Sequence, residues 1–150
     1  MRAEVPMTRK VIVVPPELTL RSAWHVMQRE RIRHLPVVRA GALVGVLSDR
    51  DVLTRSTMTK SGHLEVPTDV VVGEAMTHTP LATCEVDTDI RELVQVMTER
   101  KIDAIPVVRG LKLVGLVTST DLLLLLLDKD EARPLPFDFE LVDEPAHMMA

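Results

Sequence analysis

Residues 35–51 read Leu-Pro-Val-Val-Arg-Ala-Gly-Ala-Leu-Val-Gly-Val-Leu-Ser-Asp-Arg-Asp. Residues 105–121 read Ile-Pro-Val-Val-Arg-Gly-Leu-Lys-Leu-Val-Gly-Leu-Val-Thr-Ser-Thr-Asp, so the same pattern returns 70 positions later. The match extends outward from this motif, because 13 of the 34 residues from 20 to 53 equal the residue 70 positions further on, without a gap. An ungapped match of this length indicates an internal repeat, and we expect two copies of one structural unit.

Each copy contains a helical pattern before the repeated motif. Apolar residues recur at i, i+3, i+4 and i+7, which is one face of a helix in each copy: Leu20, Ala23, Trp24 and Met27, then Ile90, Leu93, Val94 and Met97. Thr19 is expected to cap the first helix. Asp89 and Glu92 are expected to form a capping box on the second.

Runs rich in β-branched residues predict a hairpin after each of these helices. The runs cover 35–38 and 43–47 in the first copy, and short glycine-containing turns at 39–42 and 109–112 separate the strands of each pair. A short strand, Val11–Val14 or Leu81–Cys84, precedes each first helix, and a second helix opens after each hairpin. The expected fold class is therefore α/β (α+β), with two β-α-β-β-α repeats.

The repeat sets the expected organisation of the chain. The first copy covers residues 5–57, a polar linker with Gly62 and Pro67 covers 58–69, and the second copy covers 70–127. Residues 128–150 lie outside the repeat. Their alternating stretch Phe137–Leu141 suggests an added edge strand in this C-terminal tail.

Composition excludes several classes of partner. The chain has 150 residues and a formal net charge of −4, which does not fit a general nucleic-acid binder. Aromatic residues make up only 2% of it, so a surface that stacks bases on aromatic rings is excluded as well. The longest apolar run, the six leucines Leu122–Leu127, is far shorter than the roughly 20 residues that cross a membrane. We expect that run to form a buried or a partner-facing helix.

The residues that could carry catalysis are few. The five histidines show no metal-binding spacing, and neither a nucleophile elbow nor a glycine-rich phosphate loop is present in the sequence. Cys84 lies in a predicted strand and is interpreted as a buried structural thiol. With one cysteine and no signal-like opening segment, we expect a reducing, cytoplasmic setting and no enzyme activity.

The most informative pattern is a hydroxyl and a carboxylate spaced by two residues, as Ser48-x-x-Asp51 and Thr118-x-x-Asp121. At a helix start this spacing is a capping box. The same two groups can instead exchange hydrogen bonds with the two hydroxyls of a ribose, beside the free N–H groups of the helix N-terminus. Both interpretations remain open from the residues alone.

Taken together, the repeated h-x-x-h-P-V-V and L-V-G-h-h-[S/T]-x-x-D-h-L patterns closely resemble the CBS domain, here as the tandem pair called a Bateman module. The resemblance covers about residues 5–127. It implies two units packed sheet against sheet about a pseudo-twofold axis, with two clefts between them. It also implies adenosine-containing ligands such as AMP, ADP, ATP or S-adenosylmethionine, no required cofactor and a homodimer.

Carried over position by position, the resemblance implies one cleft in which Thr118 and Asp121 hold the ribose. Its adenine would lie against the strand of Val11, Ile12 and Val13 and against Leu116, and its phosphate would face Ile32, Arg33 and His34. The other cleft would use Ser48 and Asp51 for the ribose. Its adenine would contact Val46, Pro80, Leu81 and Ala82, and its phosphate would lie at Ile102, Asp103 and Ala104. Pro36 and Pro106 would end the pocket walls.

The two clefts are not expected to bind phosphate equally. Arg33 and His34 offer charge-assisted hydrogen bonds to a phosphate, whereas Asp103 presents a like charge. The second cleft is expected to be empty or to rely on Arg50. Arg33 could equally be a solvated strand-edge arginine.

Two classes of function follow. The first is a regulatory module that senses an adenosine-containing ligand and signals to a partner protein by a change of conformation. The second is a ligand-free dimerisation or scaffold unit, in which the hydroxyl–carboxylate pairs only cap helices.

Overall fold

The computed structural model describes residues 1–78 and 82–127 of the chain. The first half holds α1 (Leu20–Glu30), β1 (His34–Arg39), β2 (Ala42–Ser48) and α2 (Asp49–Arg55). The second half holds α4 (Ile90–Arg100), β6 (Ala104–Arg109), β7 (Lys112–Thr118) and α5 (Ser119–Leu127). Four short elements lie between them: β3 (Thr57–Met58), β4 (Leu64–Glu65), α3 (Val72–Ala75) and β5 (Thr77–His78).

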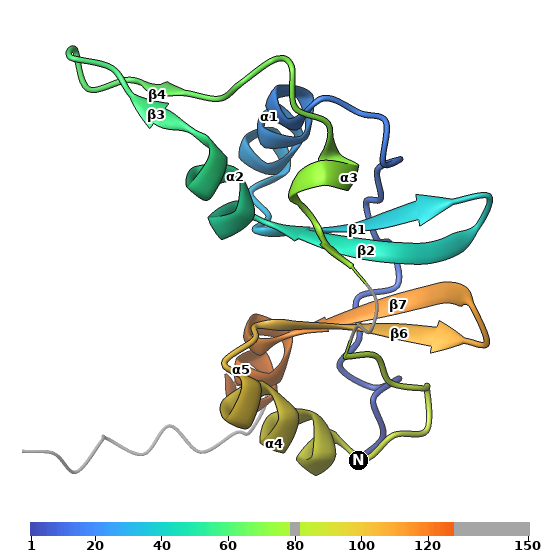
Figure 1. Cartoon of the computed structure of the whole chain (residues 1–150). Helices are drawn as coiled ribbons and strands as arrows, with labels where there is room; N and C mark the ends of the chain where they lie inside the picture. Colours follow the sequence, from blue (N-terminus) through green and yellow to red (C-terminus); the bar gives the residue numbers. More distant parts are fainter. Residues whose placement is uncertain (79–81, 128–150) are drawn as a thin grey trace, which may run out of the picture.

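The two hairpins form the centre of the molecule. β1 pairs antiparallel with β2, β6 pairs antiparallel with β7, and the register of each hairpin shifts at the same place, after Val37 and after Val107. The hairpins join through Ala42 and Lys112, which gives the sheet order β1-β2-β7-β6, with β5 on β2. The helices of each half cover the outer side of its own hairpin, so the layers run helices, hairpin, hairpin, helices (Figure 1). The mixed fold of two repeats is as the sequence predicts.

Side chains at the helix starts show how the sequence begins each helix. The Thr19 hydroxyl caps α1 by accepting a hydrogen bond from the Ser22 N–H, as predicted. Asp89 caps α4 by accepting from the Arg91 N–H at 2.8 Å. The capping box predicted for Asp89 and Glu92 is wrong, because the Asp89 carboxylate bonds to the second residue of the helix and not to the third.

The predicted strand Val11–Val14 shrinks to a single paired residue. Val14 forms a parallel bridge with Val37, in which the Val14 N–H donates to the Pro36 carbonyl and the Val38 N–H donates to the Val14 carbonyl. The next bond on either side would need an N–H from Pro16 or from Pro36, and proline has none. Cys84 bridges Val107 in the same way, and the start of the predicted strand at Leu81 lies outside the described residues.

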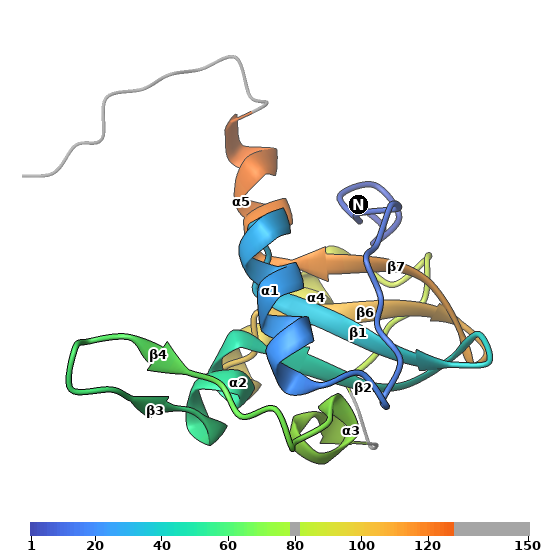
Figure 2. The same cartoon turned by 90° about the horizontal axis from the view of Figure 1, so that it is seen from above.

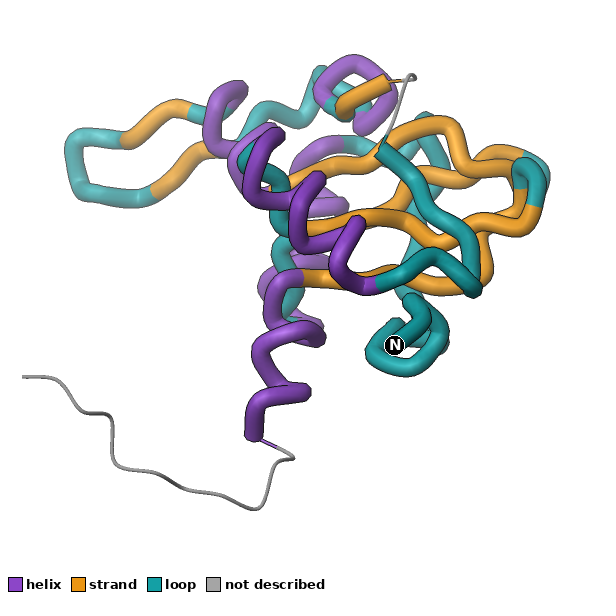
Figure 3. The backbone as a smooth tube through the Cα atoms, turned by 90° about the horizontal axis from the view of Figure 1, so that it is seen from below, coloured by secondary structure: helices purple, strands orange, loops and turns teal. Residues whose placement is uncertain are grey.

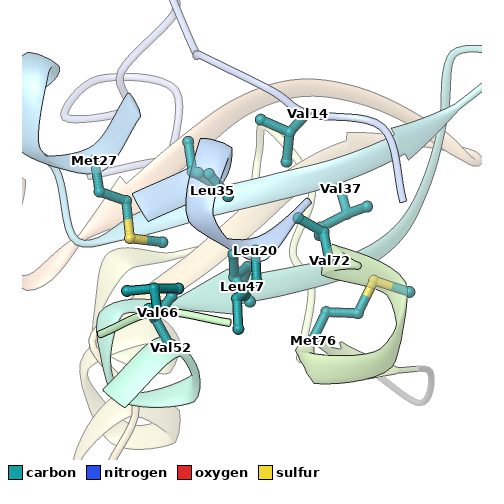
Figure 4. Packing of buried hydrophobic residues seen from close by; sticks show 11 residues of the cluster. Val14, Leu20, Met27, Leu35, Val37, Leu47, Val52, Val66, Val72 and Met76 are labelled. Atoms are coloured by element: carbon teal, nitrogen blue, oxygen red, sulfur yellow. The ribbon is translucent and has the colours of Figure 1, made fainter. Parts of the chain in front are cut away.

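Two separate cores lie on the outer sides of the hairpins. Figure 4 shows the core of the first half. This core includes Val66, which directly follows β4, Val72, the first residue of α3, and Met76, which directly follows α3. The core of the second half includes Ala3 and Met7 from the start of the chain. Figures 1 and 2 show this N-terminal segment running beside β6, β7 and α4, not beside the first hairpin.

Two short segments pack against the half that does not contain them in the repeats expected at 5–57 and 70–127. Residues 1–8 complete the second half: Met7 lies against Gly115, and Thr8 pairs with Leu116. Residues 72–78 complete the first half: Met76 lies against Gly45, and Thr77 pairs with Val46. Each half is thus finished by a segment that precedes the other half in the sequence.

The region predicted as a polar linker contains a small hairpin. β3 pairs antiparallel with β4, and this arm projects from the first half beyond α2 (Figures 2 and 3). It has no counterpart among the described residues of the second half. The edge strand predicted at Phe137–Leu141 lies outside the described residues.

The leucine run forms the last helix, α5, and none of its residues is buried. Its four most exposed leucines retain half or more of their accessible surface: Leu123, Leu124, Leu126 and Leu127. The buried alternative for this run is therefore wrong, and the partner-facing one remains. Across residues 1–78 and 82–127, no helix has both the length and the apolar character that membrane crossing requires.

Candidate functional site

Two clefts open between the halves of the molecule, one at each hydroxyl–carboxylate pair. The cleft at Ser48 and Asp51, called here the Ser48 cleft, has a volume of about 340 Å³. The cleft at Thr118 and Asp121, called the Thr118 cleft, has a volume of about 280 Å³. Each is lined by residues of both halves, so a ligand in either would contact both.

Both pairs form capping boxes at the N-termini of α2 and α5. The Ser48 N–H donates to Oδ2 of Asp51 at 2.8 Å, and the Asp51 N–H donates to the Ser48 hydroxyl at 3.2 Å. Thr118 and Asp121 repeat these two bonds at the same distances. The caps use only part of each pair, since every carboxylate keeps a second oxygen that accepts hydrogen bonds.

The two carboxylates differ in what their remaining oxygen contacts. In the Thr118 cleft, the Thr8 hydroxyl donates to Oδ1 of Asp121 at 3.2 Å and lies 3.3 Å from Oδ2. In the Ser48 cleft, Oδ1 of Asp51 accepts no hydrogen bond from the part of the chain that the structure describes. Both pairs therefore cap a helix and also present an acceptor to a cleft.

The Thr118 cleft gathers most of the residues expected there. Its lining includes Thr118, Asp121, Leu116, Val11, Ile12, Ile32, Arg33 and His34. Val13 does not line it, and its side chain is 43% exposed. Pro36, a fully buried residue of β1, does not line it either.

The Ser48 cleft likewise contains the described residues that were expected at it. Its lining includes Ser48, Asp51, Arg50, Val46, Ala82, Ile102, Asp103, Ala104 and Pro106. Pro80 and Leu81, expected against the adenine, lie outside the described residues. Ile102, Ala104 and Pro106 of the second half thus line the same cleft as the Ser48–Asp51 pair of the first half.

His34 is the one expected residue that lines both clefts. It is half-buried at the start of β1, directly across the hairpin from Ser48. Burial lowers the pKa of its imidazole below the usual range, and Arg33 acts in the same direction. Asp49, Asp103 and Asp51 oppose this shift. The net effect is that the pKa of His34 is lowered, which favours the neutral imidazole.

The single cysteine lies away from both clefts. Cys84 is buried in the second core, and burial raises the pKa of its thiol to about 11. A thiol so far from ionisation is a poor nucleophile at neutral pH, as expected for a structural cysteine. Within the described residues, no group of three or more His, Cys, Asp or Glu side chains is placed to hold a metal ion.

The CBS domain family model matches the chain twice, over residues 3–57 and 72–128. The chain belongs to the CBS-domain family. Both matches contain one hairpin and the capping pair that follows it, so the chain is a CBS-domain pair, a regulatory type of module. The family expected from the repeated motif is confirmed.

Relatives of this CBS pair include a protein of similar length and one much longer enzyme. The CBS domain-containing protein YhcV of Bacillus subtilis is 30% identical over 116 residues, which are 77% of this chain and 79% of YhcV. Inosine-5′-monophosphate dehydrogenase of Mycobacterium tuberculosis is 32% identical over 136 residues, 89% of this chain but only 23% of the enzyme. The match therefore concerns a minor part of that enzyme.

A solved structure shows the same fold with ligands. It is the CBS domain pair of protein MJ0100 in complex with 5′-methylthioadenosine and S-adenosyl-L-methionine. Its TM-score is 0.72 at 23% identity, and the alignment covers 87% of this chain and 98% of that one. At this identity the likeness concerns the fold.

The CBS clefts also contain charged residues that sequence reasoning missed. Lys10 and Arg31 line the Thr118 cleft beside Arg33, and Arg100 and Lys101 line the Ser48 cleft beside Arg50. Arg31 and Lys101 end α1 and α4 in the left-handed conformation, with φ of 55° and 54°. A basic residue at the same place in both repeats, just after each helix, was the signal that could have identified this pair.

Proposed function

We propose that this CBS pair is a regulatory module that binds adenosine-containing ligands in its two clefts and signals occupancy to a partner protein. The observation that carries the proposal is that each cleft contains a hydroxyl–carboxylate pair at a helix N-terminus, facing apolar side chains of the other half. A ribose can bond to the pair while adenine packs on the apolar wall. A ligand that contacts both halves can change their relative position.

Charge supports a nucleotide phosphate in the Thr118 cleft. Three basic side chains line it, Lys10, Arg31 and Arg33, against the single carboxylate of Asp121. The Ser48 cleft has as many acidic as basic side chains: Asp49, Asp51 and Asp103 with Arg50, Arg100 and Lys101. A phosphate gains more from the first set. AMP, ADP or ATP is therefore the ligand class for the Thr118 cleft.

The relatives support the broader class of adenosine-containing ligands. MJ0100, whose CBS pair has the same fold, binds two adenosine-containing compounds. Inosine-5′-monophosphate dehydrogenase, which acts on a purine nucleotide, contains a segment related to this chain. A chain with a single, buried cysteine, Cys84, does not depend on an internal disulfide, which fits the proposed cytoplasmic setting.

A thermal-shift panel of AMP, ADP, ATP and S-adenosylmethionine tests the proposal. A ligand at 100 times its Kd stabilises the folded state by about 2.7 kcal/mol. For a chain of this size the melting temperature should rise by roughly 5 to 10 °C. The double variant Asp51→Ala with Asp121→Ala, which disables both pairs, should not respond. If no adenosine compound shifts the wild type, the ligand-sensing proposal is wrong.

A second candidate function, a ligand-free dimerisation or scaffold module, is favoured by α5. Four leucines of that helix are exposed, which is costly in water and is relieved by contact with another apolar surface. We propose that α5 pairs with α5 of a second copy, which gives a homodimer in either function. Leu124→Glu should yield monomers by light scattering. Leu111→Glu, a change at a 78% exposed leucine in the β6–β7 turn, should leave the dimer intact.

A further inference from the structure

His34 is the only residue in the described parts of the chain that lines both clefts. Its counterpart in the second repeat, Ala104, lines only the Ser48 cleft and carries no group that titrates or donates a hydrogen bond. The repeats therefore differ at a position where the two sites meet. An imidazole can gain or lose a proton near neutral pH, whereas an alanine side chain cannot.

Charged groups act on His34 from both clefts. Asp49 and Asp51 belong to α2, and Asp103 lies in the short connection between α4 and β6; all three line the Ser48 cleft. Arg33, which precedes β1, lines the Thr118 cleft together with Lys10, Arg31 and Asp121. Arg50, Arg100 and Lys101 complete the charges of the Ser48 cleft. The protonation of His34 thus depends on the charge present in either cleft.

A phosphate in the Thr118 cleft would alter this balance. It would lie beside Arg33 and offset the positive charge that disfavours protonation of His34. The imidazole would then gain a proton and become a cation that also lines the Ser48 cleft. There it would offset the negative charge of Asp103, which otherwise opposes a second phosphate.

We propose that His34 couples the two clefts, so that an anionic adenosine ligand in the Thr118 cleft increases the affinity of the Ser48 cleft for a second one. This coupling rests on the proposed function, since it requires that both clefts accept such ligands. Coupling between two sites is reciprocal, so each ligand strengthens the other by the same factor. A coupling of about fivefold is at the lower end of the range typical of allosteric proteins.

Calorimetric titration with AMP at pH 7.5 tests the coupling. The wild type should bind two AMP molecules, the second about fivefold more tightly than independent sites would allow. His34→Ala places in the first repeat the residue that the second repeat has, and it should bind two AMP molecules independently. His25→Ala, a change of an exposed histidine on α1, should keep the wild-type coupling.

The pH dependence of the coupling shows whether His34 acts through its proton or only through its shape. The coupling should weaken as the pH falls, because the free imidazole then acquires its proton before any ligand binds. His34→Asn, which keeps a polar group but does not titrate, should show no coupling at any pH. Unchanged melting temperatures of the variants would show that they fold.

The possible outcomes distinguish this inference from the function on which it rests. If AMP does not bind the wild type at all, both are overturned. If AMP binds twice and His34→Ala retains the same coupling, or if the coupling is negative, only the role of His34 is overturned. Binding of a single AMP overturns the coupling and the second binding site, while ligand sensing through one cleft stands. If the coupling disappears both in His34→Ala and at low pH, the result supports the role of His34 in coupling the clefts.

Discussion

The Ser48 cleft and the Thr118 cleft share the same capping box at a helix start and differ in other residues that line them. In both, a capping box with equal bond distances presents a carboxylate at the start of a helix. Other lining residues differ between the repeats. Arg33 lines the Thr118 cleft, whereas Asp103, at the same repeat position, lines the Ser48 cleft. Thr8 donates a hydrogen bond to Asp121, and Asp51 has no such donor among the described residues. The capping bonds to the backbone thus recur in both halves, whereas the charged residues that line the clefts differ.

The largest difference should come from removing one carboxylate at a time. In the proposed binding mode, Asp121→Ala removes the acceptor for two ribose hydroxyls, and each bond to a charged group is worth about 1.5 kcal/mol or more. The tighter AMP site should therefore weaken about 100-fold, as measured by calorimetry. Asp51→Ala should leave that tighter site intact.

The matched pair controls for folding. Both variants lose one capping box, which costs about 1 kcal/mol of unfolding free energy in each, and Asp121→Ala also loses the bond from Thr8, about 0.5 to 1 kcal/mol more. Any difference in AMP affinity between them then reflects the cleft and not the helix. Equal weakening of the tighter site by both variants would contradict the assignment of that site to the Thr118 cleft.

Alanine substitutions at Gly45 and Gly115 should destabilise the two halves by different amounts. A Cβ at Gly45 would contact the Met76 sulfur and lie 2.8 Å from the Thr77 carbonyl oxygen, whereas at Gly115 it would lie 3.2 Å from the Thr8 carbonyl oxygen and 2.7 Å from the Met7 sulfur. A methionine side chain can move away, but a backbone carbonyl cannot. Gly45→Ala should therefore cost about 2 kcal/mol, roughly 30-fold in the unfolding equilibrium, and Gly115→Ala about 1 kcal/mol. Urea unfolding measures both, and equal costs would show that Met7 is as fixed as the backbone.

Exchanging the charged residues at positions 33 and 103 should lower the AMP affinity of the Thr118 cleft and raise that of the Ser48 cleft. Arg33→Asp places in the Thr118 cleft the residue that occupies the same repeat position in the other cleft, and AMP affinity there should fall about tenfold through loss of a charge-assisted hydrogen bond. Asp103→Arg should raise the affinity of the Ser48 cleft by a similar factor. Both changes should shrink in high salt. Affinities that do not respond to Arg33→Asp would mean that Arg33 is a solvated strand-edge residue.

The smallest difference concerns the threonines beside each pair. Thr8→Val removes the hydroxyl that donates to Asp121 and should lower the unfolding free energy by about 0.5 to 1 kcal/mol, roughly threefold in the equilibrium. Thr77 lines the Ser48 cleft, and its side chain makes no hydrogen bond to another described residue. Thr77→Val should thus leave the unfolding free energy unchanged in the same chemical denaturation experiment.

Local patterns were enough to predict the hairpins, the long helices and the capping residues. Thr19 and Ser48 cap their helices through bonds to residues only three positions away, and such short-range chemistry is readable from spacing. The strand expected at Val11–Val14 failed for a local reason as well, since Pro16 and Pro36 withhold the donors that would extend it. Greater weight on those prolines would have given the observed single bridge.

The parts that sequence reasoning missed depend on contacts between distant segments. Nothing in the pattern of residues 1–8 shows that Ala3 and Met7 belong to the core of the second half. Arg31 and Lys101 follow helix ends and resemble ordinary solvated residues until the other half is placed beside them. His34 was expected at one cleft, and only the packing of the two hairpins shows it at both.

The N-terminal segment 1–8, which packs in the core of the second half, affects how the chain folds. Thr8 and Asp121 are separated by 113 positions, so the residues synthesised first find their partners only when nearly all of the repeat is complete. Contacts over such distances slow folding, because a long loop must close before they form. The first half can close its core with residues 72–78, while the second depends on a segment from the opposite end of the chain. A truncation that removes residues 1–8 would therefore weaken the half of the molecule farthest from the cut in sequence.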